Sequence, residues 1–136
     1  MAYQELMNKA AEAREYAYTP YSHFKVGAAL LAKNGKVYTG CNIENAAYTP
    51  TVCAERTAFF KAVSEGVKEF EAIAIVGGKA GEISPFCAPC GVCRQVMAEF
   101  CDKDFKLVLG SPERFEEYSL DDVLPFAFSK LDLDLN

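Results

Sequence analysis

Apolar residues recur at helical spacing near the start of the chain, with charged and polar residues between them. The apolar positions are Leu6, Ala10, Ala13 and Ala17. This periodicity predicts an amphipathic helix over about residues 3–18, which Pro20 would end.

Two apolar runs follow on either side of a turn signal. Residues 26–32 and 37–40 flank Asn34-Gly35, the dipeptide most typical of a tight hairpin turn. The pattern therefore predicts two antiparallel strands joined by this turn.

A second helix is predicted after an irregular stretch over residues 41–50. Thr51 is a candidate N-cap for a helix over about 52–63, which would end near Gly66.

The second half of the chain continues the alternation of strand and helix. Short apolar runs at 72–76 and 106–109 predict two further strands. Between them, a loop rich in Gly and Pro over 77–89 leads into a helix that starts at about Cys90. The apolar side of that helix would carry Val92, Val96, Met97 and Phe100.

A last short helix is predicted by a capping box of Ser119 and Asp122, and Pro125 would end it. Helices that alternate with strands around one sheet predict an α/β sandwich. With 136 residues and no internal repeat or linker, the chain fits one domain over 1–136.

Composition and charge narrow the classes of function. With 51% hydrophobic and 24% charged residues, the chain is typical of globular proteins. The formal charge of −5 lies from Ser111 onward, where seven acidic residues face two basic ones. Residues 1–110 carry no net charge and have no basic stripe, which argues against a long nucleic acid as the substrate. No apolar run reaches the roughly 18 residues of a membrane span, and the polar N-terminus does not resemble a secretory signal, so we expect a cytoplasmic protein.

Six cysteines and one histidine limit the kind of metal site that the chain can form. In a reducing compartment, such cysteines favour metal binding or chemistry over disulfides. A zinc site would therefore be built mainly from thiolates. We expect His23, which lies near a predicted turn, to be structural, and Cys41 and Cys101 to be packing residues.

Two cysteine motifs lie at the predicted starts of helices. They are Cys53-Ala54-Glu55 and Pro89-Cys90-Gly91-Val92-Cys93. Unpaired N–H groups at a helix start lower thiol pKa values, so Cys53, Cys90 and Cys93 would offer three thiolates to zinc. Three protein ligands leave a fourth position for water, as in catalytic zinc sites. Glu55, two residues from a ligand, would move protons without binding the metal, and the whole set matches the three-cysteine form of the zinc-deaminase signature.

Each motif taken alone has a simpler interpretation. A Cys-x-x-Cys pair is also typical of redox proteins. An isolated Cys53 would be a small core residue, and an isolated Glu55 would be a solvated charge on a helix. The deaminase hypothesis depends on the motifs occurring together.

The chain resembles the small cytidine deaminases over about residues 4–128. The matching segments, in the family's order, are 20–29 (PYSHFKVGAA), 40–48 (GCNIENAAY), 53–58 (CAERTA), 89–95 (PCGVCRQ) and 124–128 (LPFAF). The resemblance implies a five-stranded mixed sheet flanked by helices in three layers, one zinc ion per chain and a homotetramer. In this frame Pro89, Gly91 and Arg94 surround the ligands of the second motif, which leaves Cys87 as a bystander thiol.

The resemblance also implies contacts with a nucleoside. Asn42 and Glu44 would hold the ribose hydroxyls, a task that suits an amide and a carboxylate. Phe24 would pack on the pyrimidine, Ala54 would contact the substrate, and Phe128 would reach the base bound by a neighbouring subunit. Without the resemblance, Asn42 and Glu44 would be ordinary loop residues and Phe24 a core aromatic.

The expected reaction is hydrolytic deamination of free cytidine or deoxycytidine to uridine or deoxyuridine and ammonia, a step of pyrimidine salvage. A zinc-activated hydroxide would attack C4, while Glu55 transfers the water proton to N3 and a second proton to the departing amine. Three thiolates would leave the zinc centre with a net negative charge. Arg56, beside the Cys53–Glu55 pair, is therefore expected to contact a thiolate sulfur, with a surface helix charge as the alternative.

Three other functions stay open at this point. A blasticidin-type aminonucleoside deaminase shares both cysteine motifs, although Asn42, Glu44 and Phe128 favour cytidine. The absence of a basic surface opposes a deaminase that edits nucleic acids. A structural-zinc module without activity would need a fourth ligand, for which Cys87 is the candidate, and it would leave Glu55 unexplained.

Overall fold

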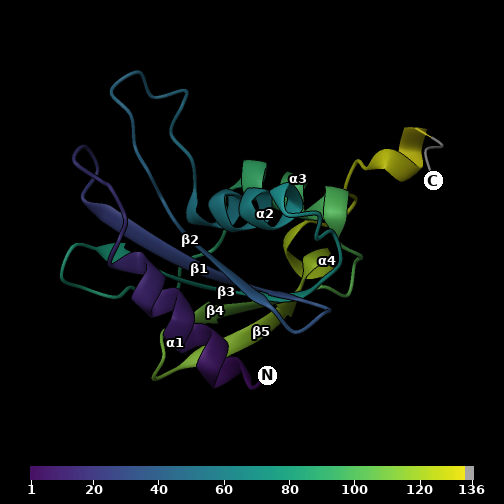
Figure 1. Cartoon of the computed structure of the whole chain (residues 1–136), viewed down its shortest axis with the longest axis horizontal. Helices are drawn as coiled ribbons and strands as arrows, with labels where there is room; N and C mark the ends of the chain where they lie inside the picture. The colour runs from purple at the N-terminus through teal and green to yellow at the C-terminus, as the bar shows by residue number, and fades with distance from the viewer. Residues whose placement is uncertain (134–136) are drawn as a thin grey trace.

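The computed structural model describes residues 1–133, which form a five-stranded mixed sheet with helices on both faces (Figure 1). The order of the strands is β2-β1-β3-β4-β5. Only β3 and β4 are parallel, and the other neighbours are antiparallel. The strands are β1 (Phe24–Ala32), β2 (Val37–Cys41), β3 (Phe70–Lys79), β4 (Lys106–Gly110) and β5 (Phe115–Ser119).

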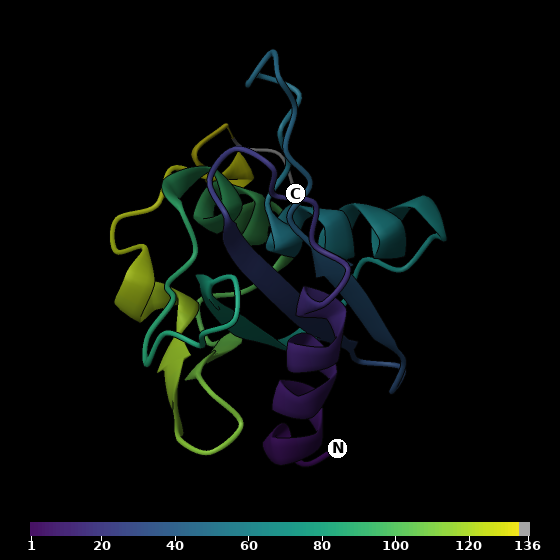
Figure 2. The ribbon, with the colours of Figure 1, turned by 90° about the vertical axis from the view of Figure 1, so that its left-hand side faces the viewer.

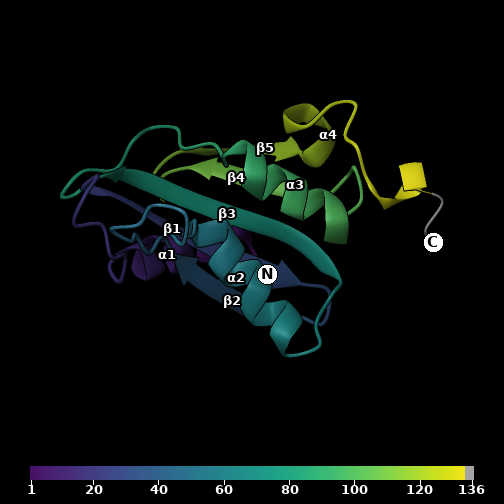
Figure 3. The same ribbon diagram turned by 90° about the horizontal axis from the view of Figure 1, so that it is seen from above.

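The helices make the outer two layers of the sandwich. They are α1 (Tyr3–Arg14), α2 (Ala54–Ser64), α3 (Gly91–Phe100) and α4 (Leu120–Val123), followed by a 3-10 helix, η1 (Lys130–Leu133). Helix α1 covers one face of the sheet, and α2 and α3 lie side by side over the other (Figure 1, Figure 3). The predicted three-layer α/β sandwich is confirmed. No helix within residues 1–133 is both long and apolar enough to cross a membrane.

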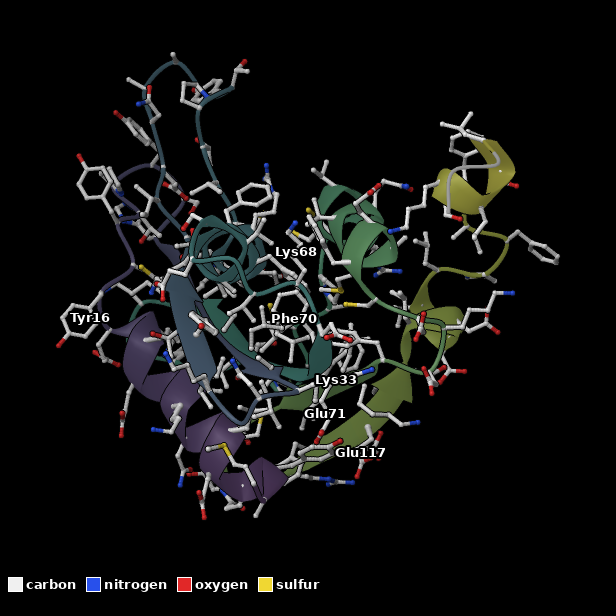
Figure 4. All side chains as sticks on the ribbon, turned by 45° about the vertical axis from the view of Figure 1, so that its right-hand side comes forward. Tyr16, Lys33, Lys68, Phe70, Glu71 and Glu117 are labelled. Atoms are coloured by element: carbon white, nitrogen blue, oxygen red, sulfur yellow. The ribbon has the colours of Figure 1, made fainter. Side chains whose placement is uncertain are left out.

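Two hydrophobic clusters join these layers, one on each face of the sheet. Alternate residues of β1 point to opposite faces, so that Ala28 and Leu30 pack under α2 whereas Ala29 and Leu31 pack under α1. The cluster under α2 is centred on Phe59, whose ring lies edge-on to that of Phe70 with 5.0 Å between their centroids. Phe70 is seen between the sheet and α2 in Figure 4.

A glycine allows the second helix to lie directly on strand β2. A Cβ atom on Gly40 would lie 2.5 Å from the carbonyl oxygen of Ala54 and 2.7 Å from the nitrogen of Ala58. No side chain fits at this position. The contact fixes the first turn of α2, which follows Cys53, against the sheet.

The first helix is shorter than the sequence pattern predicts. It ends at Arg14 rather than near residue 18. The Arg14 side chain is buried and donates hydrogen bonds to the carbonyl oxygens of Lys25, Gly78 and Lys79. These bonds tie the end of α1 to β1 and β3, and the chain then runs outward to a bridge between Tyr18 and Ile43.

The start of α2 also differs from the prediction. Its N-cap is Cys53, with φ −77° and ψ 157°, and not Thr51. Val52 is held in an antiparallel bridge with Ile43, and the Thr51 hydroxyl accepts a hydrogen bond from the nitrogen of Asn45. Because of this extended pairing, α2 starts two residues later than predicted.

Three local predictions, for a turn, a helix cap and the apolar side of a helix, can also be compared with the structure. The hairpin at Asn34-Gly35 is confirmed, with Gly35 at φ 91°. The capping box of Ser119 and Asp122 is confirmed at the start of α4. Val92, predicted on the apolar side of its helix, is 57% exposed, because α3 turns Cys93 and Met97 toward the core instead.

Candidate metal centre and active site

Three cysteine thiols converge where the N-termini of α2 and α3 meet. Cys53 is the N-cap of α2, Cys90 is the N-cap of α3, and Cys93 lies in the first turn of α3. The Sγ atoms of Cys53 and Cys90 are 3.6 Å apart, as are those of Cys90 and Cys93. All three sulfurs lie within 4.8 Å of one another.

This donor set fits a zinc ion. Tetrahedral zinc with Zn–S bonds of about 2.3 Å holds its sulfur ligands roughly 3.8 Å apart, close to the observed separations. Cys93 is buried and Cys90 is exposed, so the group spans from the core to the surface. Three thiols suit zinc and leave one coordination position for another ligand.

Neighbouring groups favour the ionised form of Cys53. A hydrogen bond with Cys93, helped by others from Arg56 and Cys90, lowers the pKa of Cys53 to about 5. The same bond, together with burial, raises the pKa of Cys93. One thiolate is therefore stabilised by its neighbours, which is the ionisation that metal binding requires.

Glu55 is a buried carboxyl group on the first turn of α2, next to the cluster. Its side chain is only 4% exposed. Burial raises the pKa of Glu55 to about 7, and the nearby Cys53 contributes in the same direction. A carboxyl group poised between its two forms near neutral pH suits general acid–base chemistry.

Arg56 and Thr57, the next two residues of α2, both bond to Cys53. The Arg56 Nη2 donates to the Sγ atom of Cys53 over 3.4 Å, as the sequence predicted for a contact with a thiolate. The Thr57 hydroxyl lies 3.2 Å from the carbonyl oxygen of Cys53 and 3.1 Å from that of Cys41. The sequence analysis assigned no role to Thr57. A threonine four residues after an N-cap is the signal that would have found it, since such hydroxyls often bond to the preceding turn.

Cys87 lies outside the three-thiol group. Its Sγ atom packs against the end of β3, where a Cβ atom on Gly77 would lie 2.5 Å away. Burial raises the pKa of Cys87 to about 11, the opposite of the shift at Cys53. Cys101 is likewise a packing thiol against the cluster under α2, and burial raises its pKa to about 12. Cys41, for which we also predicted a packing role, is half-buried at the end of β2.

Backbone pairing joins the segment that carries Asn42 and Glu44 to the residue before Cys53. Ile43, between them, exchanges two hydrogen bonds of 3.0 Å with Val52, the residue before Cys53. The Asn42 side chain accepts from the nitrogen of Val26 over 2.9 Å and donates to the carbonyl oxygen of Phe24 over 2.8 Å.

The Glu44 carboxylate also has partners within the chain. It accepts hydrogen bonds from the nitrogens of Tyr21 and Ser22, both 3.1 Å, and from the Ser22 hydroxyl. These bonds, first of all that from the Ser22 hydroxyl, lower the pKa of Glu44. Asn42 and Glu44 are thus held rigidly, and Phe24, at the start of β1, is 37% exposed.

Two of the remaining predicted residues are placed by α2 and α3. Ala54 is fully buried as the first helical residue of α2. Phe128 is 61% exposed in the segment after α4, and its carbonyl oxygen accepts a hydrogen bond from Gln95 of α3. His23 adopts φ 59°, and its backbone bonds to Thr19 and Ala80, in keeping with a structural role.

Comparison with known proteins assigns this arrangement to a family. A family model described as the cytidine and deoxycytidylate deaminase zinc-binding region matches residues 1–109. The chain belongs to this deaminase family. Its match includes both cysteine motifs, and the three-thiol cluster is suited to zinc binding.

Individual members of the family are similar over nearly the whole chain. A cytidine deaminase of Sporosarcina psychrophila is 53% identical over 134 residues, which cover 98% of this chain and 96% of that protein. A probable cytidine deaminase of Dictyostelium discoideum is 44% identical over 131 residues, covering 96% and 86%. The crystal structure of a cytidine deaminase from Burkholderia pseudomallei has a TM-score of 0.85 at 48% identity and covers 94% of this chain and all of that one. The deaminase fold and the family resemblance are both confirmed.

Proposed function

We propose that the protein hydrolyses free cytidine and deoxycytidine to uridine and deoxyuridine, with release of ammonia, as an enzyme of pyrimidine salvage. The observation that carries the proposal is the buried carboxyl group of Glu55 beside three convergent thiols at two helix starts. Similarity to proteins named cytidine deaminase over nearly the whole chain supports this substrate class.

Cys53, Cys90 and Cys93 would hold one zinc ion per chain. When bound, zinc supplies a Lewis acid that makes water acidic enough to act as a nucleophile near neutral pH. Glu55 would take a proton from the attacking water and transfer it to N3 of the cytosine. It would then take the proton of the new hydroxyl group at C4 and transfer it to the amine, which leaves as ammonia. One carboxyl group serves both transfers because they are sequential, and its raised pKa lets it hold and release a proton in turn.

The nucleoside would be held by the residues on the Ile43 side of the cluster. Asn42 keeps one N–H and one lone pair after its two backbone bonds, and Glu44 keeps a lone pair on Oε2, so both can bind ribose hydroxyls. Because these side chains are already fixed by the fold, little rotamer entropy is lost on binding. Phe24 would pack on the pyrimidine, and Ala54 would line the site at the start of α2.

The protein would assemble as a homotetramer with active sites shared between subunits. Large aromatic side chains are exposed on segments that leave the body of the fold: Tyr16 is 82%, Tyr48 75% and Phe128 61% exposed. Tyr16 points outward beyond the end of α1 (Figure 4), and the arm over residues 43–52 extends away from the sheet (Figure 2). Burial of such groups against further copies would remove their apolar surface from water. Phe128 from a neighbouring copy would then stack on the bound base.

The alternatives considered from the sequence are less well supported. A structural-zinc module needs a fourth ligand, but Cys87 lies outside the thiol group within residues 1–133. The relatives that cover nearly the whole chain are named cytidine deaminases rather than antibiotic or nucleic-acid deaminases. Six free thiols, three of them needed as metal ligands, favour a reducing compartment such as the cytoplasm.

The proposal is tested by an absorbance assay on cytidine, deoxycytidine, cytosine and CMP, with zinc measured on the same preparation. We expect turnover of both nucleosides with one zinc ion per chain and weak activity on free cytosine. No nucleoside turnover by fully zinc-loaded protein would reject the function. Equal activity on cytosine and cytidine would reject ribose binding by Asn42 and Glu44.

The shared site is tested by mixing two impaired variants, Glu55→Ala and Phe128→Ala, after subunit exchange has been demonstrated. Mixed assemblies would contain sites with Glu55 from one parent and Phe128 from the other, so activity should rise above that of both parents. Activity that stays at the average of the two parents would show that Phe128 acts within its own chain.

A further inference from the structure

Two side chains that directly follow Cys93 on α3 reach across to the C-terminal part of the chain. Arg94 Nη1 donates to the carbonyl oxygen of Val123 over 2.6 Å, and its Nε donates to that of Pro89 over 2.8 Å. Gln95 Nε2 donates to the carbonyl oxygen of Phe128 over 2.7 Å. The helix that carries two thiols of the metal centre thus also holds the end of α4 and the segment that follows it.

Few other hydrogen bonds hold the segment that contains Phe128. Within residues 1–133, no backbone hydrogen bond joins residues 126–128 to a helix or strand. Phe126 has a left-handed φ of 56° and a fully exposed side chain. The Gln95 amide is therefore the polar contact that fixes the backbone of Phe128 relative to α3.

We propose that Gln95 is a positioning residue of the shared active site, whose side-chain amide sets the place from which Phe128 is presented to a neighbouring copy. The inference rests on the proposed function, in which Phe128 contacts the bound base. Cys93 and Gln95 lie two residues apart on one helix. The helix that supplies two thiols of the cluster in one subunit therefore also holds the backbone of the aromatic residue given to the next.

A double-mutant cycle tests whether Gln95 acts through Phe128. Gln95→Leu replaces an exposed amide by a shorter apolar side chain, so that the donor is lost without disturbance of the core. We expect Phe128→Ala to lower kcat/KM for cytidine at least five-fold, the low end of what loss of a base–aromatic stack gives, about 1–3 kcal/mol. Gln95→Leu should lower it at least three-fold with unchanged zinc content. The double variant should stay within about two-fold of Phe128→Ala, because the second change then has nothing left to misplace.

The outcomes separate this inference from the proposed function. Losses that multiply in the double variant, or a normal kcat/KM for Gln95→Leu beside an impaired Phe128→Ala, would overturn the positioning role alone. A normal kcat/KM for Phe128→Ala would overturn both the role of Phe128 in the shared site and the inference that rests on it.

Amide hydrogen exchange gives a second measurement that does not depend on activity. In Gln95→Leu, the Ser129 amide should exchange faster than in the parent, because it shares a peptide group with the Phe128 carbonyl and donates to Asp132 Oδ2. Glu12→Leu, a matched apolar change at an exposed position of α1, should leave this amide unchanged. Equal exchange in the parent and Gln95→Leu would contradict the proposal.

Discussion

Arg56 Nη2 lies 3.4 Å from the Sγ atom of Cys53, its neighbour one helical turn earlier on α2. This contact places a permanent positive charge against the thiol of Cys53, a proposed zinc ligand. Three thiolates around Zn²⁺ carry more negative charge than the metal neutralises, which weakens the pull of the metal on a water molecule. With zinc bound as proposed, the guanidinium would draw electron density from Cys53 and so preserve the Lewis acidity that the reaction needs.

Arg56→Gln should therefore keep zinc but lose turnover. Removal of a group that hydrogen-bonds to a metal ligand typically costs about 10–100-fold in activity or affinity, and we expect a fall of kcat in that range. Steady-state kinetics together with zinc analysis is the measurement. Unchanged kcat would mean that Arg56 is only a surface charge.

Measurement of zinc content should distinguish variants of the three convergent cysteines from a variant of Cys87. Cys53→Ala, Cys90→Ala and Cys93→Ala each remove one of three convergent sulfurs and should lose zinc and activity. Cys87→Ala is the matched control, because its thiol packs against Gly77 outside that group, and it should retain both. Loss of zinc from Cys87→Ala together with its retention in Cys93→Ala would overturn the ligand assignment.

Substitution by alanine should have opposite effects on the free energy of unfolding at two glycines near the site. In Gly40→Ala the new methyl group would meet the carbonyl oxygen of Ala54 at 2.5 Å, so α2 must move away from the sheet. Overpacking of this kind costs about 1–3 kcal/mol, and the zinc affinity should fall with the displacement of Cys53. Gly91 lies between the ligands of α3, but a Cβ atom there would meet nothing within 4 Å. Gly91→Ala should leave the free energy of unfolding unchanged or higher, and the opposite ranking in denaturant titrations would contradict the packing argument.

Glu44 should stabilise the fold in a pH-dependent way. Its native pKa is lowered, chiefly by the Ser22 hydroxyl, so its contribution is full above the unfolded pKa of about 4.3 and is lost as pH falls through the native value. Thermal unfolding of the parent and Glu44→Gln should show a higher Tm for the parent at pH 7. That difference should shrink below about pH 4. A difference that stays constant down to pH 3 would show that the charge of Glu44 plays no part.

Local patterns were enough to predict most of the elements and the three thiols that converge in the structure. Turn chemistry located the hairpin at Asn34-Gly35, and the two motifs identified the thiols because both motifs lie at helix starts. Strand β5 was missed by the pattern, because its central residues Glu116 and Glu117 are exposed acids on an edge strand. An edge strand of this kind lacks the apolar alternation on which strand prediction depends.

What the sequence pattern could not supply are the long-range contacts. Arg14 looks like an ordinary charge at the end of a helix, yet its buried side chain binds carbonyl oxygens 64 and 65 residues away. Gly40 looks like an ordinary strand glycine, but α2 lies against it. Such roles depend on which elements meet in the fold, and no local propensity records this.

The central claim is that Glu55 moves the protons at a three-thiolate zinc centre, and Glu55→Gln tests it most directly. The amide fills the same space but cannot shuttle a proton, so the variant should bind one zinc ion per chain and unfold at the parent's Tm. General acid–base groups typically contribute about 10²–10⁴-fold, and we expect the fall of kcat for cytidine to reach at least the upper end. Zinc-loaded, folded Glu55→Gln with near-normal turnover would contradict the account.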